Sequence, residues 1–155
     1  MLTIEQPIPN ISFQATNQLQ GTLADFRGQA LVLYFYPKDN TPGCTRETKE
    51  FRDHYAQFVD CQTQILGVSR DSLASHEKFK TKLNLPFELI SDAEETLCQA
   101  FDVIRLKNMF GKKIHGIERS TFLIDAQGQL KQQWRKVKVA NHVAQVLAAA
   151  KSSIG

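Results

Sequence analysis

The sequence predicts a single domain of the α/β class, with a central mixed sheet flanked by helices and preceded by an N-terminal hairpin. Apolar strand patterns alternate with amphipathic helix patterns along most of the chain, and a second hairpin and a helix close it. A chain of 155 residues with 42% hydrophobic and 23% charged residues can bury one sizeable core. Because no linker, repeat or low-complexity segment interrupts these patterns, we expect residues 1–155 to fold as one unit.

The first elements are three strands and a long helix. Residues 11–15 and 19–23 have the short patterns of a hairpin, and residues 30–36 form the continuous apolar run of a buried strand. The helix that follows is expected to end at residues 60–64. Its apolar face contains Phe51, Tyr55, Phe58 and Val59.

The middle of the chain continues the alternation. Residues 65–69 predict a second buried strand, residues 87–90 a third, and residues 93–101 a short helix. Another helix lies between the second and third strands, because four residues trace one helical face: Leu73, His76, Phe79 and Leu83. The stretch from residue 102 to residue 120 is expected to be irregular.

A hairpin and a helix close the chain. Residues 121–124 and 130–135 predict two strands, and Ala126-Gln127-Gly128 between them is a hairpin signal. The last helix is amphipathic, with apolar positions at Val139, Val143, Val146, Leu147 and Ala150.

One thiol lies where the pattern changes from strand to helix. Cys44 follows the buried strand by a few residues and is predicted to lie in the first turn of the next helix. Unpaired backbone N–H groups and the positive end of the helix dipole favour a thiolate there, and the thiolate is the nucleophilic form. The sequence therefore predicts thiol chemistry at Cys44.

Several short motifs occur in order along the chain. They are Tyr36-Pro37-Lys38-Asp39, Thr41-Pro42-Gly43-Cys44-Thr45, Gly67-Val68-Ser69 and Gly116-Ile117-x-Arg119-Ser120-Thr121-Phe122. Together they resemble the peroxiredoxins, and most closely the bacterioferritin-comigratory-protein or Prx Q type, from about residue 7 to the C-terminus. The resemblance implies a thioredoxin-like fold of peroxiredoxin type. It also implies a thiol-dependent peroxidase that reduces hydrogen peroxide and organic hydroperoxides.

The resemblance further implies a role for each matching residue. Peroxide would convert Cys44 to a sulfenic acid. The hydroxyl of Thr41, the backbone N–H groups of Gly43 and Cys44, and the guanidinium of Arg119 would stabilise charge as the O–O bond breaks. Pro37 would shield the thiolate from water.

Each of these residues also has an ordinary structural interpretation. Pro37 can simply end a strand, Thr41 can belong to a common turn, and Arg119 can pair with a surface carboxylate. Glu47, one turn into the helix, can hydrogen-bond near Arg119 or be a solvated acid of the first turn. The combined spacing favours the functional interpretation of the set.

The second cysteine of many Prx Q proteins has no counterpart here, since its usual places hold Lys49 and residues 79–80. Cys61 is seventeen residues beyond Cys44 on the same predicted helix, about 25 Å away, whereas a disulfide needs Cα atoms within about 7 Å. We therefore predict a one-cysteine cycle in which glutathione, glutaredoxin or thioredoxin reduces Cys44. The alternative is internal resolution by Cys98, which would first have to leave an apolar helix face.

Charge and composition exclude several other classes. The net charge of +3 comes mainly from residues 105–113 and 131–138, which we interpret as solvated basic faces rather than a nucleic-acid site. No stretch is apolar enough for a membrane span, and no leader pattern is present. Three cysteines without a C-x-x-C pair favour a reducing compartment, so we expect a cytoplasmic protein.

No cofactor or metal site is expected. The four histidines show no spacing that would bring two of them onto one face with a cysteine: His54, His76, His115 and His142. By analogy with the family, we expect a monomer.

Two other functions would fit the fold. A thioredoxin-like disulfide oxidoreductase would reduce insulin, but it needs a nearby second thiol that the sequence lacks. A non-catalytic thioredoxin-fold binding module would be silent in every thiol and peroxide assay, and it would have no use for the complete set of motif residues.

Overall fold

The computed structural model describes residues 2–153, apart from the side chain of Met109. Within this range, seven strands form one mixed sheet in the order β2-β1-β5-β4-β3-β8-β9. The pairs β3–β4 and β4–β5 are parallel, and the other neighbours are antiparallel. The strands are β1 (Ser12–Ala15), β2 (Gln20–Thr22), β3 (Ala30–Phe35), β4 (Thr63–Ser69), β5 (Glu88–Ser91), β8 (Ser120–Ile124) and β9 (Leu130–Trp134).

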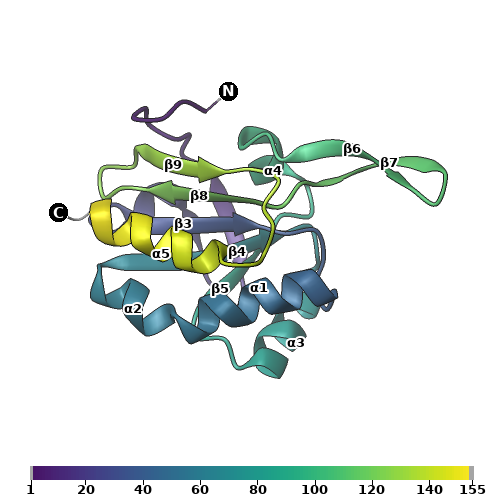
Figure 1. Ribbon diagram of the computed structural model, residues 1–155, viewed down its shortest axis with the longest axis horizontal. Helices are drawn as coiled ribbons and strands as arrows, with labels where there is room; N and C mark the ends of the chain where they lie inside the picture. The colour runs from purple at the N-terminus through teal and green to yellow at the C-terminus, as the bar shows by residue number, and fades with distance from the viewer. Residues whose placement is uncertain (1, 154–155) are drawn as a thin grey trace.

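Helices cover the sheet on both faces. One face packs against α1 (Pro42–Asp53), α2 (Tyr55–Asp60), α3 (Leu73–Leu83) and α5 (His142–Ser153), and Figure 1 shows α1, α2 and α5 in front of the strands. The other face packs against α4 (Thr96–Ala100), the 3-10 helix η1 (Leu23–Phe26) and the N-terminal segment. The mixed α/β class and the N-terminal hairpin predicted from the sequence are confirmed.

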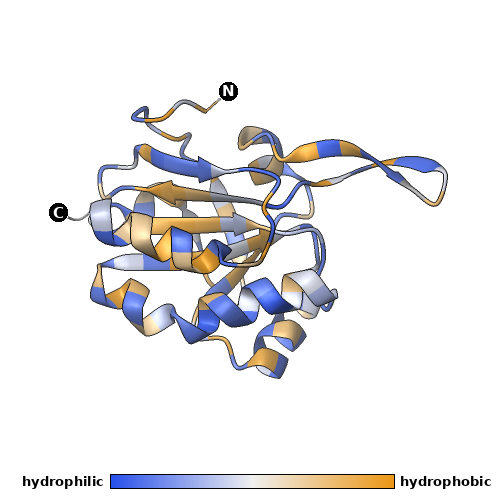
Figure 2. Ribbon diagram, viewed as in Figure 1, coloured by the Kyte–Doolittle hydropathy of each residue, from blue (hydrophilic) through white to orange (hydrophobic). Residues whose placement is uncertain are grey.

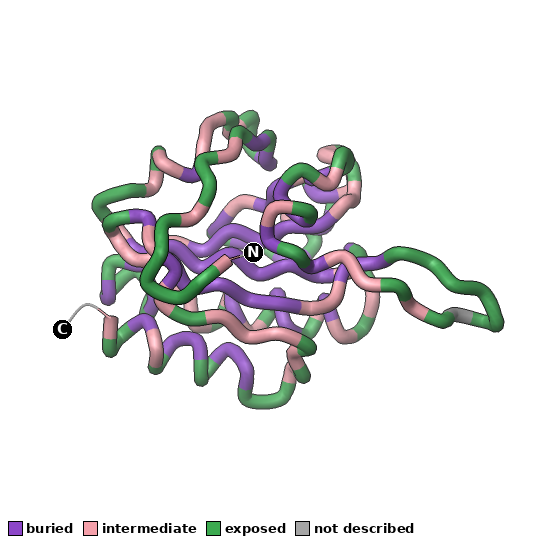
Figure 3. Tube along the Cα trace, turned by 90° about the horizontal axis from the view of Figure 1, so that it is seen from above, coloured by how far each residue is buried: buried purple, intermediate pink, exposed green. Residues whose placement is uncertain are grey.

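Strand β3 lies at the centre and divides the buried apolar side chains into two clusters. All six of its residues are buried, as the continuous apolar run predicts. Alternate side chains point to opposite faces, so Val32 and Tyr34 join the cluster under α1, while Leu33 and Phe35 join the cluster under α4. Strand β3 is hydrophobic in Figure 2, and the strands in the middle of the sheet are buried in Figure 3.

The helix after β3 is not continuous, which corrects the prediction. It is broken at His54, which ends α1 and precedes α2. The His54 ring lies 2.8 Å from the carbonyl oxygen of Glu50 and so occupies an acceptor at the end of α1. Val59, assigned from its spacing to the apolar face, is 48% exposed, and Phe58 is the buried residue of α2.

The stretch expected to be irregular contains a further hairpin, which the sequence did not predict. Strands β6 (Ile104–Met109) and β7 (Lys112–Ile117) pair only with each other and project from the molecule (Figure 1). The turn residues Phe110 and Gly111 both have positive φ, 52° and 78°, as a two-residue hairpin turn of type I′ requires. The hairpin is mostly exposed (Figure 3), so it lacks the buried apolar face by which strands are predicted.

The other predicted elements are present, with one correction at the last helix. Val139, predicted to lie on its apolar face, precedes α5 (His142–Ser153), because Asn141 has a positive φ of 63° that does not continue a helix. Strands β8 and β9 are joined by the predicted turn, in which Gly128 has φ 81° and donates its N–H to the carbonyl of Asp125 at 3.0 Å. Helix α5 buries Val143, Val146, Leu147 and Ala150. Within residues 2–153, no helix is long and apolar enough to cross a membrane.

Candidate active site

The candidate site lies where β3 ends and α1 begins, at the carboxyl end of the central strand. Pro42 is in the first turn of α1, Thr41 is its N-cap residue, and Cys44 lies one residue beyond Gly43. The sulfur-bearing side chain of Cys44 is only 1% exposed. Because first-turn amides have no carbonyl partner within a helix, the N–H groups of Gly43 and Cys44 can point at a ligand.

Sheet pairing brings Arg119 to the sulfur of Cys44. Strand β8 pairs with β3, and Ser120 lies opposite Phe35, so the residue before Ser120 reaches the end of β3. Nη2 of Arg119 lies 3.3 Å from Sγ of Cys44. A Cβ atom on Gly43 would lie 3.2 Å from the same Nη2, which gives a steric reason for glycine at this position. The interpretation of Arg119 as a partner of a surface carboxylate therefore does not hold.

The carboxylate that binds Arg119 is Glu47. Nη1 of Arg119 donates to Oε1 of Glu47 at 2.7 Å, and the Glu47 side chain is fully buried. Burial alone would lower the pKa of Arg119, but the charges of Glu47 and Cys44 outweigh it and raise that pKa, so the guanidinium stays cationic. Of the two interpretations left open for Glu47, the structure supports the contact with Arg119.

Glu47 is an unusual carboxyl group. Burial raises its pKa to about 7, although Arg119 opposes this shift. Its second oxygen, Oε2, has no hydrogen-bond partner among the described residues and lies 4.0 Å from Nε2 of His142. Burial lowers the pKa of His142 to about 4, with a smaller contribution from Arg119, so His142 is neutral near pH 7. The site thus holds a second titratable group besides the thiol.

The loop between β3 and α1 carries Pro37 and Thr41. The Thr41 hydroxyl donates to the carbonyl oxygen of Lys38 at 2.8 Å. Since a hydroxyl has only one proton to donate, Oγ1 of Thr41 can only accept a hydrogen bond from a molecule bound at the site. Pro37 directly follows the buried Tyr36 and is itself half-buried.

The other two cysteines lie away from Cys44. Cys61 is close to Thr63, which pairs with Ala30 at the opposite end of β3, so a strand of six residues, about 20 Å, separates it from the site. The separation of Cys61 from Cys44 thus follows from the length of β3, and not from one continuous helix as the sequence predicted. Cys98 packs in the cluster on the other face of the sheet, and burial, together with Asp92, raises the pKa of its thiol well above the ordinary value.

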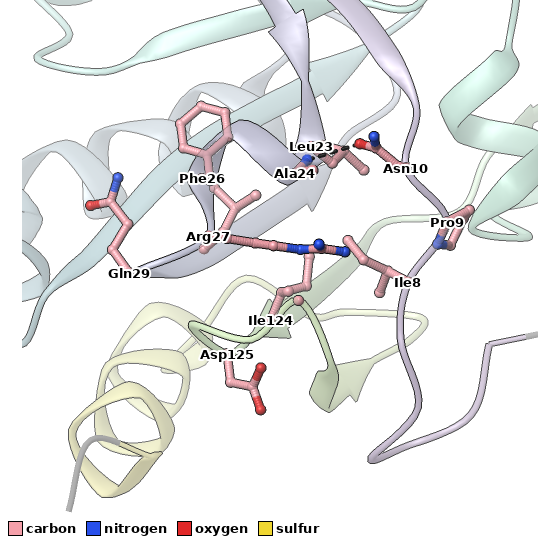
Figure 4. Close-up of a pocket in the computed structure, with 12 residues that line it drawn as sticks. Ile8, Pro9, Asn10, Leu23, Ala24, Phe26, Arg27, Gln29, Ile124 and Asp125 are labelled. Atoms are coloured by element: carbon pink, nitrogen blue, oxygen red, sulfur yellow. Dashed lines mark hydrogen bonds between the residues drawn. The ribbon is translucent and has the colours of Figure 1, made fainter.

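An apolar hollow elsewhere on the surface is a poorer candidate site (Figure 4). It is lined by residues such as Ile8, Leu31 and Ile124, and so lies at the end of β3 opposite to Cys44. The side chains around it include no cysteine, serine or histidine that could act as a nucleophile or general base.

Sequence reasoning missed a polar cluster behind the loop. Asp39, Asp71 and His76 place ligand-type atoms within 4.8 Å of one another, and Asp39 and His76 are buried. Two short motifs could have indicated this cluster: Tyr36-x-x-Asp39 and Asp71-x-x-x-x-His76. The family motifs include the first of these but not Asp71 or His76.

A cysteine in the first turn of a helix, beside the end of a central strand and held by a half-buried arginine, defines a thiol-reactive enzyme of the thioredoxin-like class. Comparison with known proteins specifies the family. The AhpC/TSA family model matches residues 4–133. The chain is 51% identical to Peroxiredoxin Bcp of Bacillus subtilis over 152 residues, which is 97% of each chain.

Solved structures give the same result. A structure of Xanthomonas campestris Peroxiredoxin Q superposes with a TM-score of 0.90 at 50% identity, covering 94% of this chain and 92% of the other. A mutant of Xylella fastidiosa PrxQ superposes with a TM-score of 0.94 at 42% identity, covering 100% and 99%. The chain therefore belongs to the AhpC/TSA family and, within it, to the peroxiredoxins of the Bcp or Prx Q type. The resemblance, the fold and the thiol-dependent peroxidase activity predicted from the sequence are confirmed.

Proposed function

We propose that Cys44 is the residue that reduces the peroxide. Its thiolate sulfur attacks one peroxide oxygen, the O–O bond breaks, and the other oxygen leaves and takes up a proton to become water or an alcohol. The sulfur is oxidised to a sulfenic acid. The observation that carries this assignment is the contact of 3.3 Å between Sγ of Cys44 and the guanidinium of Arg119.

The neighbouring groups have complementary roles in this step. Arg119 stabilises both the thiolate and the negative charge that develops on the peroxide oxygens, and Glu47 holds its guanidinium in place. Oγ1 of Thr41 accepts the peroxide O–H, and the amides of Gly43 and Cys44 donate to the oxygens. Pro37 excludes water from the thiolate. Acceptors and donors would then surround the O–O bond before it breaks.

The proposed substrates are hydrogen peroxide and organic hydroperoxides. The bacterioferritin comigratory protein of Xanthomonas campestris, whose trapped intermediate and ligand complexes concern its alkyl peroxide reduction activity, is 46% identical over 99% of this chain. Only the –OOH group needs to reach the donors and the acceptor described above. The same residues would therefore serve peroxides with different organic groups.

For the second half of the cycle we propose a one-cysteine type, in which glutathione, glutaredoxin or thioredoxin reduces the sulfenic acid. Two placements support this: Cys61 lies at the far end of β3, and Cys98 lies across the sheet with a thiol that resists ionisation. We also propose that the protein acts as a monomer in the cytoplasm, where free thiols such as these persist.

The test compares three single variants. Cys44→Ser should abolish peroxide consumption, whereas Cys61→Ser and Cys98→Ser should keep the rate of sulfenic acid formation, measured by stopped-flow fluorescence of Trp134 or by a competing peroxidase. Comparable losses in all three would refute the assignment to Cys44.

Mass spectrometry after one equivalent of peroxide, without reductant, tests the resolution step. We expect a sulfenic acid on Cys44. A disulfide between Cys44 and Cys98 that disappears in Cys98→Ser would show internal resolution, and a linked dimer would contradict the monomeric cycle.

A further inference from the structure

A buried carboxylate anchors the loop that carries Pro37 and Thr41. Oδ1 of Asp39 accepts the hydroxyl of Tyr36 at 2.7 Å, and Oδ2 accepts the hydroxyl of Ser75 at 2.8 Å and lies 2.8 Å from Nδ1 of His76. Burial alone would raise the pKa of Asp39, but the contacts with His76, Tyr36 and Ser75 outweigh it and hold that pKa below its ordinary value. Asp39 is therefore a charged group fixed to β3 and to α3.

Both ring nitrogens of His76 have partners. Nδ1 faces the carboxylate of Asp39, and Nε2 lies 2.9 Å from the carbonyl oxygen of Ile90. Ser69 cannot supply a proton to Nε2, because its hydroxyl is donated to Asp71 at 2.5 Å. The ring of His76 therefore lies between the carboxylate of Asp39 on the loop and the carbonyl of Ile90 on β5. The loop is thus held to α3 by buried polar contacts from Asp39 to Ser75 and His76.

One peptide group connects this anchor to Thr41. The N–H of Asp39 donates to Oδ2 of Asp71 at 2.9 Å. The carbonyl of the same peptide group belongs to Lys38, and it accepts the hydroxyl of Thr41 at 2.8 Å. A rotation of this peptide group would break both hydrogen bonds together. The orientation of the Thr41 hydroxyl therefore depends on carboxylates that do not face the thiol.

We propose that Asp39, Asp71 and His76 are positioning residues of the peroxidase reaction: they fix the Lys38–Asp39 peptide group so that the Thr41 hydroxyl keeps its proton on Lys38 and presents only lone pairs to the peroxide. This rests on the proposed function, in which Thr41 accepts the peroxide O–H. Without the anchor, the Thr41 hydroxyl can rotate and turn its proton toward the peroxide instead. The thiolate then remains, but the peroxide loses its acceptor.

The test is a double-mutant cycle between Asp71→Ala and Thr41→Val. Asp71 is chosen because it is half-buried and makes no part of the contact between Asp39 and His76, so its removal leaves that contact in place. The Thr41 side chain makes no cap bond to α1, so valine removes only the hydroxyl. Two rates are measured for each variant: peroxide consumption and alkylation of Cys44 by iodoacetamide, which needs the thiolate but not the acceptor.

We expect Asp71→Ala to lower the peroxide rate by about fivefold, which is the effect of one weakened hydrogen bond, and to leave the alkylation rate unchanged. In the Thr41→Val background the same substitution should cause no further loss. Asp71→Asn, which keeps an acceptor oxygen, should restore most of the rate. Asp60→Ala removes an exposed carboxylate at the end of α2 and serves as the matched control.

Three results would overturn the inference: an unchanged peroxide rate in Asp71→Ala, an equal loss of alkylation, or losses that multiply in the double variant. These differ from a failure of the proposed function, in which the parent protein would consume no peroxide through Cys44. Asp39→Asn provides a second measurement. It weakens the contacts of the loop with Ser75 and His76, so it should also lower the peroxide rate and leave the alkylation rate of Cys44 unchanged, and an unchanged peroxide rate would contradict the anchor.

Discussion

Cys44 and Cys98 are buried to almost the same degree, 1% and 0% exposed, and both lie in short segments that begin a helix. They differ in the charge beside them. Cys44 has the guanidinium of Arg119 at 3.3 Å, whereas the amide of Cys98 donates to the carboxylate of Asp92 at 2.8 Å, and that carboxylate opposes ionisation of the thiol. Exposure therefore does not distinguish these two thiols. The sign of the charge beside each sulfur does, and the assignment of the peroxidase reaction to Cys44 that we propose depends on this difference.

The largest expected effect on the rate with peroxide comes from replacing the guanidinium of Arg119 by a group with the same charge and a different shape. Arg119→Lys keeps the positive charge at Cys44 but loses the planar fork that binds Glu47 and the sulfur together. We expect the second-order rate with peroxide to fall at least about tenfold, or about 1.4 kcal/mol, even at a pH where the Cys44 thiol is fully ionised. Stopped-flow kinetics across pH is the measurement. Recovery of the parent rate at high pH would limit Arg119 to promoting ionisation.

A smaller, pH-dependent effect is expected from Glu47→Gln. The amide resembles the protonated carboxyl, and the pKa of Glu47 is about 7, so parent and variant should have similar activity at pH 6. Above pH 7 the parent gains a carboxylate that orients Arg119, and the variant should be slower there by about threefold to tenfold. A ratio of activities that does not change with pH would show that Glu47 does not titrate in this range.

The same group predicts a change in stability. The folded-state pKa of Glu47 lies above its unfolded value of 4.5, so the unfolded chain loses its proton first as the pH rises. Between pH 4.5 and 7 this group should cost the folded state up to about 3 kcal/mol, and Glu47→Gln should remove that cost. Urea unfolding at pH 5 and pH 7 measures the difference. If the variant loses as much stability as the parent over this interval, burial of Glu47 is not the cause.

The smallest effect is expected at the unreactive cysteine. Asp92→Asn removes the opposing charge near Cys98, but burial is the larger cause of the raised pKa of that thiol and remains. Alkylation of Cys98 in the folded protein should rise by less than about tenfold and stay far below that of Cys44. Peptide mapping after a timed iodoacetamide pulse distinguishes the two sites. Equal labelling of both cysteines would contradict the role assigned to neighbouring charge.

Local patterns explain which parts of this molecule could be predicted from its sequence. The buried strand β3 and the start of α1 follow from residues that are adjacent in the chain, so the placement of Cys44 could be predicted directly. The position of Arg119 beside it depends on the antiparallel pairing of β3 with β8, which no local pattern contains, and only the family resemblance indicated it.

Two features could not be anticipated for related reasons. The anchor of Asp39 on His76 joins residues from a loop and from α3, and it forms only because β3 and β4 lie side by side. The hairpin of β6 and β7 buries few of its residues. Its sequence therefore lacks the alternation of apolar and polar residues from which a strand is predicted. Hydrogen bonds between distant residues and the pairing of exposed strands could thus be seen only in the structure.

The projecting hairpin of β6 and β7 offers a position for a fluorescent label on this enzyme. Phe110 at its turn is 99% exposed, while the base of the hairpin is tied down by the contact of Arg70 with the carbonyl of His115. A fluorescent amino acid at position 110 would therefore report tumbling and association of the molecule without a new thiol and without entering either core. Such a probe would follow encounters with reductants in real time.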